Sequence, residues 1–248
     1  MANTFQGLHA RHYDLIYAEK PYADEASFVH DLLGGEPGRL LDVACGSGRH
    51  AVEFAKLGWD VSGVDYSPDL LERARAERAE IEFYEQDMRE LDVPGGPFDG
   101  ITCLFDSIGY PQDNDGIVAT LAGMRRHLAP GGRIAVEFLH APAMLAHADP
   151  VRVRRWELPD GGRLMRVSET AIDATAMTMH VSYELLELTA DGKYDRAEER
   201  QSNRFFAVEE MRALMALAGL RVARFVPAYA DGDIDADTFH VMALAGAT

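Results

Sequence analysis

Glycines and a carboxylate are concentrated in one short segment, where the apolar run Leu40–Val43 leads into Ala44-Cys45-Gly46-Ser47-Gly48. An apolar strand that enters a glycine turn and then a helical pattern lets the backbone approach a ligand closely. Gly46 to Ala51 also fits the G-x-G-x-x-A spacing of dinucleotide-binding loops. Such a match alone is weak and is also consistent with a tight structural turn. The segment therefore predicts either a nucleotide-type ligand or a simple turn.

Further carboxylates follow the next two apolar runs. Asp65 ends the second run, where a carboxylate can accept hydrogen bonds from both hydroxyls of a ribose. Asp87-Met88 follows the third run and offers a carboxylate for an adenine amino group and a thioether for its ring. Taken singly, Asp87 is better explained as a solvated loop acid and Met88 as a core residue. Their position after Asp65 favours an adenosine-binding role instead.

Asp42 distinguishes between two kinds of ligand, because it lies within the first apolar run, just before the glycine turn. A dinucleotide loop holds a pyrophosphate on backbone amides, and a carboxylate beside them would repel that anion. A cationic ligand that carries a sulfonium and an ammonium group is compatible with the same carboxylate. Asp42 therefore argues against a nicotinamide-dependent oxidoreductase, which stays an alternative hypothesis.

The order of the elements predicts how these residues are positioned. Strand-like runs alternate with helical patterns, and Ser67 as N-cap followed by Pro68 marks one helix start. Such alternation predicts a parallel sheet covered by helices. The predicted strands are Arg39–Ala44, Trp59–Val64, Ile81–Tyr84, Phe98–Phe105 and Arg133–Phe138, and the predicted helices are Asp24–Leu33, Gly48–Leu57, Pro68–Arg78 and Asp115–Leu128.

The second half of the chain changes character. Turn residues such as Asp160-Gly161 and Asp191-Gly192 separate four strand-like runs, which predicts an antiparallel insertion. The runs are Val151–Leu158, Arg163–Thr170, Met177–Leu188 and Lys193–Ser202, followed by a helix at Val208–Ala218 and strands at Leu220–Ala228 and Thr238–Ala243. We therefore expect an α/β protein with a Rossmann-like, seven-stranded, mostly parallel sheet flanked by helices, and an antiparallel β insertion after strand five.

Composition limits the functional classes. The 248 residues carry a net charge of −17, so most of the surface would repel a nucleic acid. No apolar stretch is long enough for a membrane span, and the first ten residues lack a signal-peptide pattern. The two cysteines, Cys45 and Cys103, lie within apolar runs and predict neither a disulfide nor a metal site. We expect a cytoplasmic protein that binds neither nucleic acid nor membrane.

Together with Ala129-Pro130-Gly131-Gly132, the segments from Leu40 to Phe138 resemble the class I S-adenosylmethionine-dependent methyltransferases. The resemblance implies S-adenosyl-L-methionine as cofactor and S-adenosyl-L-homocysteine as product. It also implies that Asp42 acts through water, Asp65 binds the ribose and Leu104 or Phe105 supplies a carbonyl. The full set of expected cofactor-binding residues is Tyr13, Tyr22, Asp42, Ala44, Gly46, Gly48, Arg49, His50, Asp65, Tyr66, Ser67, Asp87, Met88, Leu104 and Phe105.

A closer resemblance covers Ala10–Tyr17, Asp87-Met88-Arg89 and Phe105–Tyr110, which are similar to the amino-sugar N-methyltransferases of natural-product biosynthesis. It implies that residues 1–35 form a helical lid, that 36–149 and 204–248 form the core, and that 150–203 form the insertion. Methylation of a small-molecule amine is therefore expected. An O-methyltransferase of a natural product or sugar hydroxyl, and a non-catalytic cofactor-binding scaffold, stay as alternatives.

Four residues are candidates for the chemistry at the acceptor. Methyl transfer needs alignment and exclusion of water, and a base is needed mainly when the acceptor is a hydroxyl. Tyr110 and His140 follow strands that end at the predicted ligand edge, and Tyr17 comes from the N-terminal segment. Glu137 can hold an ammonium or pair with Arg155. Each has an ordinary alternative, as a packed aromatic ring, a lid-helix residue, a loop histidine or an ion-pair partner.

The start of the insertion is rich in arginine. Arg152, Arg154, Arg155 and Trp156 form either a wall of the substrate site or the surface of a homodimer. The sequence does not distinguish between these two roles.

Overall fold

The computed structural model describes residues 5–78, 80–147 and 149–248. Residues 1–4 of the predicted lid, and 79 and 148 of the predicted core, lie outside the described residues. The helices are α1 (Gly7–Arg11), α2 (Tyr13–Ile16), α3 (Tyr22–Leu33), α4 (Arg49–Lys56), α5 (Pro68–Glu77), α6 (Asn114–His127), α7 (Ala141–His147) and α8 (Val208–Leu217), with short 3₁₀ turns η1 (Met88–Glu90) and η2 (Ser107–Gly109).

The strands form two sheets. They are β1 (Arg39–Val43), β2 (Asp60–Asp65), β3 (Glu82–Glu85), β4 (Phe98–Cys103), β5 (Leu128–Leu139), β6 (Val151–Glu157), β7 (Arg163–Asp173), β8 (Thr178–Leu188), β9 (Tyr194–Arg204), β10 (Leu220–Pro227) and β11 (His240–Ala247). A seven-stranded sheet has the order β10-β11-β5-β4-β1-β2-β3, and a four-stranded sheet the order β6-β7-β8-β9. The predicted fold class is confirmed.

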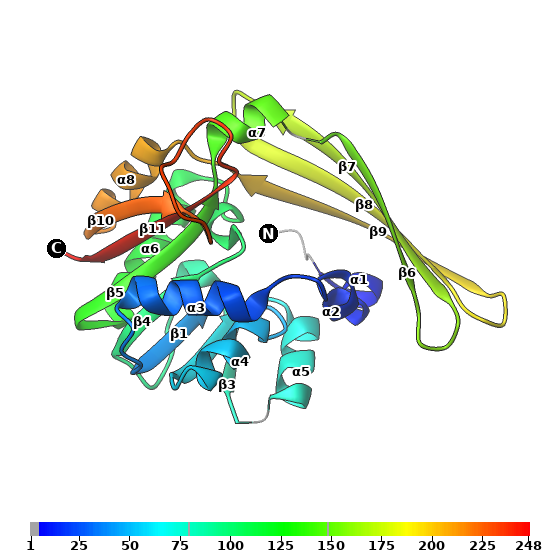
Figure 1. Ribbon diagram of the computed structural model, residues 1–248, viewed down its shortest axis with the longest axis horizontal. Coiled ribbons are helices and arrows are strands. Elements are labelled where there is room, and N and C mark those ends of the chain that lie inside the picture. Colours follow the sequence, from blue (N-terminus) through cyan, green and yellow to red (C-terminus); the bar gives the residue numbers. More distant parts are fainter. Residues whose placement is uncertain (1–4, 79, 148) are drawn as a thin grey trace.

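The seven-stranded sheet is parallel from β3 to β5, whereas β11 runs antiparallel between β5 and β10. Its central strands β1, β4 and β5 are buried on both faces, and each face of the sheet has its own core. Leu41 and Val43 belong to the core that includes α6 and α8, while Leu40 belongs to the core that includes α3, α4 and α5. Figure 1 shows the helices on the two sides of this sheet. The parallel strands therefore present their carboxyl ends along one edge.

Two strand ends differ from the sequence prediction. β4 ends at Cys103 rather than at Phe105, because Phe105 and Asp106 have φ values of 55° and 58° and leave the extended conformation. β5 begins at Leu128 rather than at Arg133, because Leu128 already pairs with Phe98 across an irregularity in the ladder. Helix α7 was not predicted. Its Pro142 favours a loop on sequence alone, although proline is well accepted in a first helical turn.

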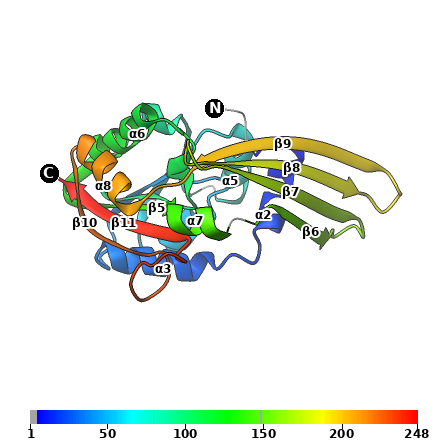
Figure 2. The same ribbon diagram turned by 90° about the horizontal axis from the view of Figure 1, so that it is seen from above.

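The four-stranded sheet projects from the core as a long twisted arm (Figures 1 and 2). One face packs against the N-terminal helices, through a cluster in which Leu8 and Ile16 contact Leu164 and Leu185. Leu164 and Leu185 are fully buried although the arm is largely exposed on its other face. The sheet and the helices α1 and α2 therefore stabilise each other. No described helix is long and apolar enough to cross a membrane.

Candidate cofactor and acceptor site

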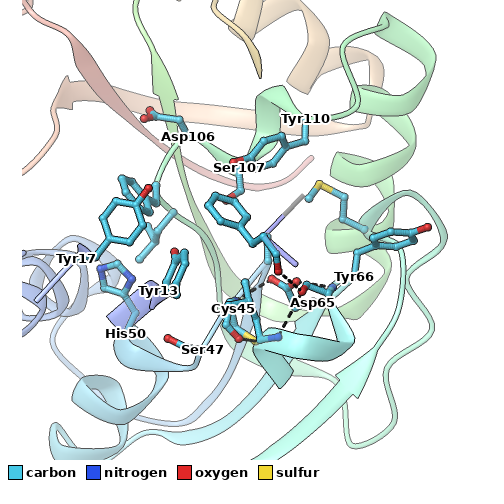
Figure 3. A pocket seen from close by; sticks show the side chains of 18 of the residues that line it. Tyr13, Tyr17, Cys45, Ser47, His50, Asp65, Tyr66, Asp106, Ser107 and Tyr110 are labelled. Carbon is cyan, nitrogen blue, oxygen red and sulfur yellow. Dashed lines mark hydrogen bonds between the residues drawn. The ribbon is translucent and has the colours of Figure 1, made fainter. Parts of the chain in front are cut away.

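A cavity of about 220 Å³ lies at the carboxyl ends of β1, β2 and β4, between the N-terminal helices and the arm (Figure 3). Five regions supply its lining: the N-terminal segment (Phe5, Tyr13, Tyr17, Tyr22), the end of β1 with the following turn and α4 (Asp42, Ala44, Cys45, Gly46, Ser47, Arg49, His50), the end of β2 with the regions after β2 and β3 (Val64, Asp65, Tyr66, Ser67, Leu70, Gln86, Met88), the β4 and β5 ends (Leu104, Phe105, Asp106, Ser107, Tyr110, Leu139) and the arm (Met179, Val181, Tyr183, Gln201, Asn203).

The glycine turn has the backbone conformation that its sequence predicts. Gly46 and Gly48 have φ values of 56° and 77°, which glycine adopts at little cost. The Gly46 amide donates to Asp65 Oδ2 at 2.8 Å, and the Ser67 amide donates to Asp65 Oδ1 at 2.8 Å. Burial raises the pKa of Asp65, although these amides partly oppose that shift. Asp65 therefore holds together the two turns that line this part of the cavity.

Asp42 is buried, and only one of its two carboxylate oxygens accepts a hydrogen bond within the described residues. Thr102 Oγ1 donates to Asp42 Oδ1 at 2.8 Å, whereas Oδ2 has no partner within the described part of the chain. Burial raises the pKa of Asp42 to about 6. A buried carboxylate oxygen without a partner is costly, so this atom is suited to a water molecule or to a cationic ligand.

The N-terminal helices are attached to the glycine turn through Asp14. Ser47 Oγ donates to Asp14 Oδ1 at 2.7 Å, and Arg73 Nη2 donates to Asp14 Oδ2 at 2.8 Å. The guanidinium of Arg49 lies 4.8 Å from the centre of the Tyr22 ring. These contacts place Tyr13, Tyr17 and Tyr22 over the cavity, where the sequence predicts a lid.

Aromatic and amide side chains surround the other end of the cavity. Tyr110 and Tyr17 face residues of the arm, among them Tyr183, and Asn203 Nδ2 donates to the Asp106 carbonyl at 3.1 Å. Burial raises the pKa of Tyr110 well above its usual value, and the neighbouring tyrosines raise it further. Tyr110 is therefore a neutral hydroxyl across the pH range of ordinary assays, able to donate or accept a hydrogen bond.

A charged cluster adjoins this end of the cavity, where Asp106 belongs to the lining and Glu137 and His240 lie behind it. His240 Nδ1 is 3.0 Å from Asp106 Oδ2 and 3.4 Å from Glu137 Oε1. The charge of Asp106 is the main cause that raises the pKa of His240 to about 11. Burial alone would raise the pKa of Glu137, but hydrogen bonds and the charge of His240 lower it. His240 is therefore protonated near neutral pH and is unable to accept a proton.

Glu137 also fixes the backbone that follows β4. Its Oε2 accepts from the Phe105 amide at 2.7 Å and from the Tyr229 hydroxyl at 2.6 Å. The expectation that Glu137 pairs with Arg155 is corrected, because the partners that the structure gives it are Phe105, Tyr229 and His240. Glu137 lies behind the cavity lining rather than in it.

Three further predicted residues also lie outside the cavity lining. Gly48 is the N-cap of α4 and packs on Phe83, where a Cβ would lie 2.8 Å from the ring. Both carboxylate oxygens of Asp87 accept hydrogen bonds from Arg89. His140 is buried at the end of β5 and its Nδ1 donates to the Thr238 carbonyl at 3.0 Å. The structure thus turns His140 away from the acceptor, and the remaining predicted site residues line the cavity.

Several lining residues were not predicted from the sequence. Met179, Val181 and Tyr183 follow the inward alternation of β8, and Gln201 and Asn203 follow that of β9. The sequence predicts the strands and their alternation, but it does not tell which face meets the core. Asp106 and Ser107 follow a predicted strand at the ligand edge, so their position was a signal that could have identified them.

Known proteins show the same architecture. Residues 40–132 match a family model described as a methyltransferase domain. The chain is 34% identical over 224 residues to the dTDP-3-amino-3,4,6-trideoxy-alpha-D-glucopyranose N,N-dimethyltransferase of Streptomyces venezuelae, with 86% of this chain and 90% of that protein covered.

Two solved structures extend the similarity over nearly the whole chain. The first, the S-adenosylmethionine-bound amino pentose methyltransferase of Micromonospora echinaspora involved in calicheamicin biosynthesis, is 28% identical with a TM-score of 0.76, covering 96% of this chain and 98% of that one. The second, the DesVI protein of Streptomyces venezuelae, is 27% identical with a TM-score of 0.80 and the same coverage.

The sheet order, the glycine turn and the carboxylates at the strand ends define a Rossmann-like nucleotide-binding enzyme of the methyltransferase class. The chain belongs to the class I S-adenosylmethionine-dependent methyltransferases. The cavity fits that cofactor, because Asp42 presents an unpartnered carboxylate oxygen suited to its ammonium group and Asp65 lies where a ribose is bound in such folds.

Proposed function

We propose that the chain transfers a methyl group from S-adenosylmethionine to the nitrogen of a small-molecule amine. The observation that carries this proposal is the acceptor end of the cavity, where Tyr110, Tyr17 and Asp106 lie together beneath the arm. Similarity to amino-sugar N,N-dimethyltransferases supports the same acceptor class.

An amine is favoured over a hydroxyl because of the titratable groups at this end. A hydroxyl acceptor needs a base near its proton, whereas an amine reacts through its own lone pair. Here Tyr110 stays neutral, Asp106 is paired with His240, and His240 is already protonated. Within the described residues, none of these groups is a free base of suitable pKa. The pocket therefore favours alignment of a neutral amine over activation of a hydroxyl.

The chain contributes binding, alignment and exclusion of water. When bound, S-adenosylmethionine supplies a methyl carbon already activated by the sulfonium. Asp42, Asp65, Gly46 and Met88 would hold it, and the tyrosines of the N-terminal segment would cover it. Tyr17 and Tyr110 would orient the amine by hydrogen bonds, which lowers the entropic part of the barrier.

The proposal is tested in two steps. Titration calorimetry with S-adenosylhomocysteine and with NAD checks the cofactor, and binding of NAD alone would contradict the methyltransferase function. Methyl transfer is then measured across amines, phenols and sugars for the wild type and for Tyr110→Phe, with His140→Ala as a control outside the cavity. We expect product from amines, and a lower kcat for Tyr110→Phe only. Products from hydroxyls alone would overturn the amine assignment.

We also propose that residues 1–35 act as a lid and that the insertion, residues 150–203, forms a wall of the substrate site with its inner face. We further propose that the chain works in the cytoplasm and forms a homodimer. Exposed apolar side chains on the outer face of the arm support the dimer: Val151, Val153, Leu188 and Tyr194 are 53%, 49%, 46% and 75% exposed. They alternate with the inward residues and so share one face.

A further inference from the structure

Glu25, in the first turn of α3, is a buried carboxylate that lies next to the cavity without belonging to its lining. Its Oε1 accepts from Lys20 Nζ at 2.6 Å, and its Oε2 accepts from His50 Nε2 at 2.7 Å. Only 5% of Glu25 is exposed, and a carboxylate buried this far is costly unless its charge and its hydrogen-bonding capacity are matched. Both oxygens of Glu25 therefore have a partner, one an ammonium group and the other an imidazole.

Lys20 holds one side of this carboxylate and is itself nearly buried. It lies between α2 and α3, with 13% of its side chain exposed. Its Nζ lies 4.5 Å from the centre of the Phe105 ring and 5.6 Å from that of Tyr229, where cation–π contacts stabilise an ammonium group. Lys20 is thus fixed by Glu25 and by two aromatic rings, and the position of the Glu25 carboxylate is fixed with it.

His50 brings the other side of the carboxylate to the cavity. It belongs to the first turn of α4 and lines the cavity, as does Asp42. Burial is the main cause that raises the pKa of Asp42 to about 6, and the charge of His50 is the main cause that opposes it. An imidazole that donates to a carboxylate is favoured in its protonated form, because the two charges attract. Glu25 therefore acts on Asp42 through His50.

Other ionisable side chains also face the pair of His50 and Asp42. They are Tyr22 on α3, Arg49 on α4, Asp14 on α2 and Asp65 on β2. Burial raises the pKa of Tyr22, so its hydroxyl is neutral, and the Asp65 oxygens accept from backbone amides. Among the described residues, Glu25 is the carboxylate that hydrogen-bonds His50.

We propose that Glu25 is a positioning residue for the cofactor: it orients the His50 ring and keeps a positive charge there, so that Asp42 and His50 form an ionised pair in the cavity wall. The methionyl part of S-adenosylmethionine carries an ammonium and a carboxylate, so a wall with one charge of each sign matches both. This inference rests on the proposed function, because it concerns the same cofactor. Its test measures binding and needs no acceptor.

The test is titration calorimetry of the full chain with S-adenosylhomocysteine from about pH 5 to about pH 8. The wild type is compared with Glu25→Gln, which keeps the size of the side chain but removes its charge, and with Glu25→Asp, which keeps the charge. Asp24→Asn is the matched control, because it removes an exposed carboxylate from the neighbouring position of α3. Circular dichroism shows whether each variant is folded. His50→Gln removes the same positive charge and serves as a second variant should Glu25→Gln not fold.

We expect the affinity of the wild type to rise through about pH 6, where Asp42 ionises. In Glu25→Gln the midpoint of this rise should lie about one pH unit higher, with affinity at pH 6 about fivefold lower. His50→Gln should shift the midpoint in the same direction. Glu25→Asp and Asp24→Asn should leave it near that of the wild type.

An unchanged midpoint in a folded Glu25→Gln or, if that variant does not fold, in His50→Gln would overturn the inference. A shift in Glu25→Asp as large as that in Glu25→Gln would also overturn it, because the charge is kept. So would an equal shift in Asp24→Asn, which would report net charge alone. These results would leave the proposed function intact, since the wild type still binds S-adenosylhomocysteine. Failure of the wild type to bind it at any pH would instead count against the proposed function.

Discussion

Asp42 and Asp65 are buried carboxylates in one cavity, yet the protein uses them differently. Asp65 has both oxygens satisfied by backbone amides of the two turns beside it. Asp42 is satisfied only by Thr102 and keeps one oxygen without a partner in the described chain. Because unpaired burial disfavours the charged form, the pKa of Asp42 rises to about 6. Asp65 therefore organises the loops, and Asp42 is left available for the cationic cofactor.

The first prediction concerns the pH dependence of cofactor binding. The ionised form of Asp42 favours a cationic ligand, so affinity for S-adenosylhomocysteine, which keeps the ammonium group, should increase as pH rises through about 6. Between pH 5 and pH 7 the expected gain is about tenfold, measured by calorimetry. Asp42→Asn should bind more weakly at pH 7 and lose most of this pH dependence. Asp31→Asn, an exposed change on α3, is the control, and an unaltered pH profile in Asp42→Asn would refute the assignment.

The second prediction concerns Asp65. Asp65→Ala removes the acceptor for the Gly46 and Ser67 amides and the carboxylate expected at the ribose. Affinity for S-adenosylhomocysteine should fall about 10- to 100-fold, because a hydrogen bond to a charged group contributes about 1.5–3 kcal/mol. Calorimetry at pH 7.5 measures it, with circular dichroism to show that the fold is kept. A loss smaller than threefold in a folded variant would contradict the role.

At the scale of elements, the end of β4 is held in an unfavourable conformation by its neighbours. Phe105 and Asp106 are consecutive non-glycine residues with positive φ, which costs energy that other contacts must offset. Glu137 from β5 accepts the Phe105 amide, and His240 from β11 pairs with Asp106. The strands on one side of the sheet therefore fix the loop that carries Tyr110 to the acceptor end.

The third prediction follows from this arrangement. The pKa of His240 is raised from 6.5 to about 11, so its stabilisation is full below pH 6.5 and is lost progressively as pH rises through 11. The side chain is 42% exposed, so we expect His240→Ala to cost only about 1–2 kcal/mol in the free energy of unfolding at pH 7. Urea unfolding should show a smaller cost at pH 10. His180→Ala on the exposed face of the arm is the control, and an equal cost at both pH values would argue against the ion pair.

The fourth prediction tests how the arm and the lid stabilise each other. Leu185→Ala removes a fully buried side chain from the cluster shared with Leu8 and Ile16. The free energy of unfolding should fall by about 2–4 kcal/mol, and the KM for S-adenosylmethionine should rise because the lid is less well held. Leu186→Ala, on the same strand but the other face, should cost less and leave KM unchanged. Similar KM changes in both variants would show that the arm does not position the lid.

At the scale of the whole molecule, the site is assembled from three regions that are distant in sequence. The strand ends, the N-terminal helices and the arm all contribute residues to the lining of the one cavity (Figures 1 and 3). In the proposed function the strand ends would bind the cofactor, the N-terminal helices would cover it and the arm would close the acceptor end. The outer face of the arm takes no part in this assembly and carries the exposed apolar side chains of the proposed dimer.

The fifth prediction concerns that dimer. The 27.4 kDa chain should elute with about twice its mass in size-exclusion chromatography with light scattering. Val153→Glu adds a charge to the outer face on the edge strand β6 and should give the monomer, while Leu217→Glu, an exposed apolar position on α8, serves as the control. A wild-type chain that is monomeric at micromolar concentration would disprove the proposal.

The sequence alone determined the order of the elements and placed most of the residues that line the cavity at the strand ends, although Gly48 and Asp87 lie outside that lining. Local patterns are sufficient for this part of the cavity, because a strand, a glycine turn and a helix N-terminus are contiguous in the sequence. Parallel strands then bring Asp42 and Asp65 to one edge of the sheet, whatever fold the later part of the chain adopts. The seven-stranded sheet and its insertion could be predicted for the same reason.

Only the tertiary structure decided the acceptor half. Glu137 lies in the expected strand and His140 just beyond it, yet contacts with Thr238, Tyr229 and His240, about 90 or more residues away, turn both side chains from the cavity. Which face of the arm meets the core also depends on its packing against Leu8 and Ile16. Alternation along a strand defines two faces but does not say which is buried, because that depends on partners distant in sequence.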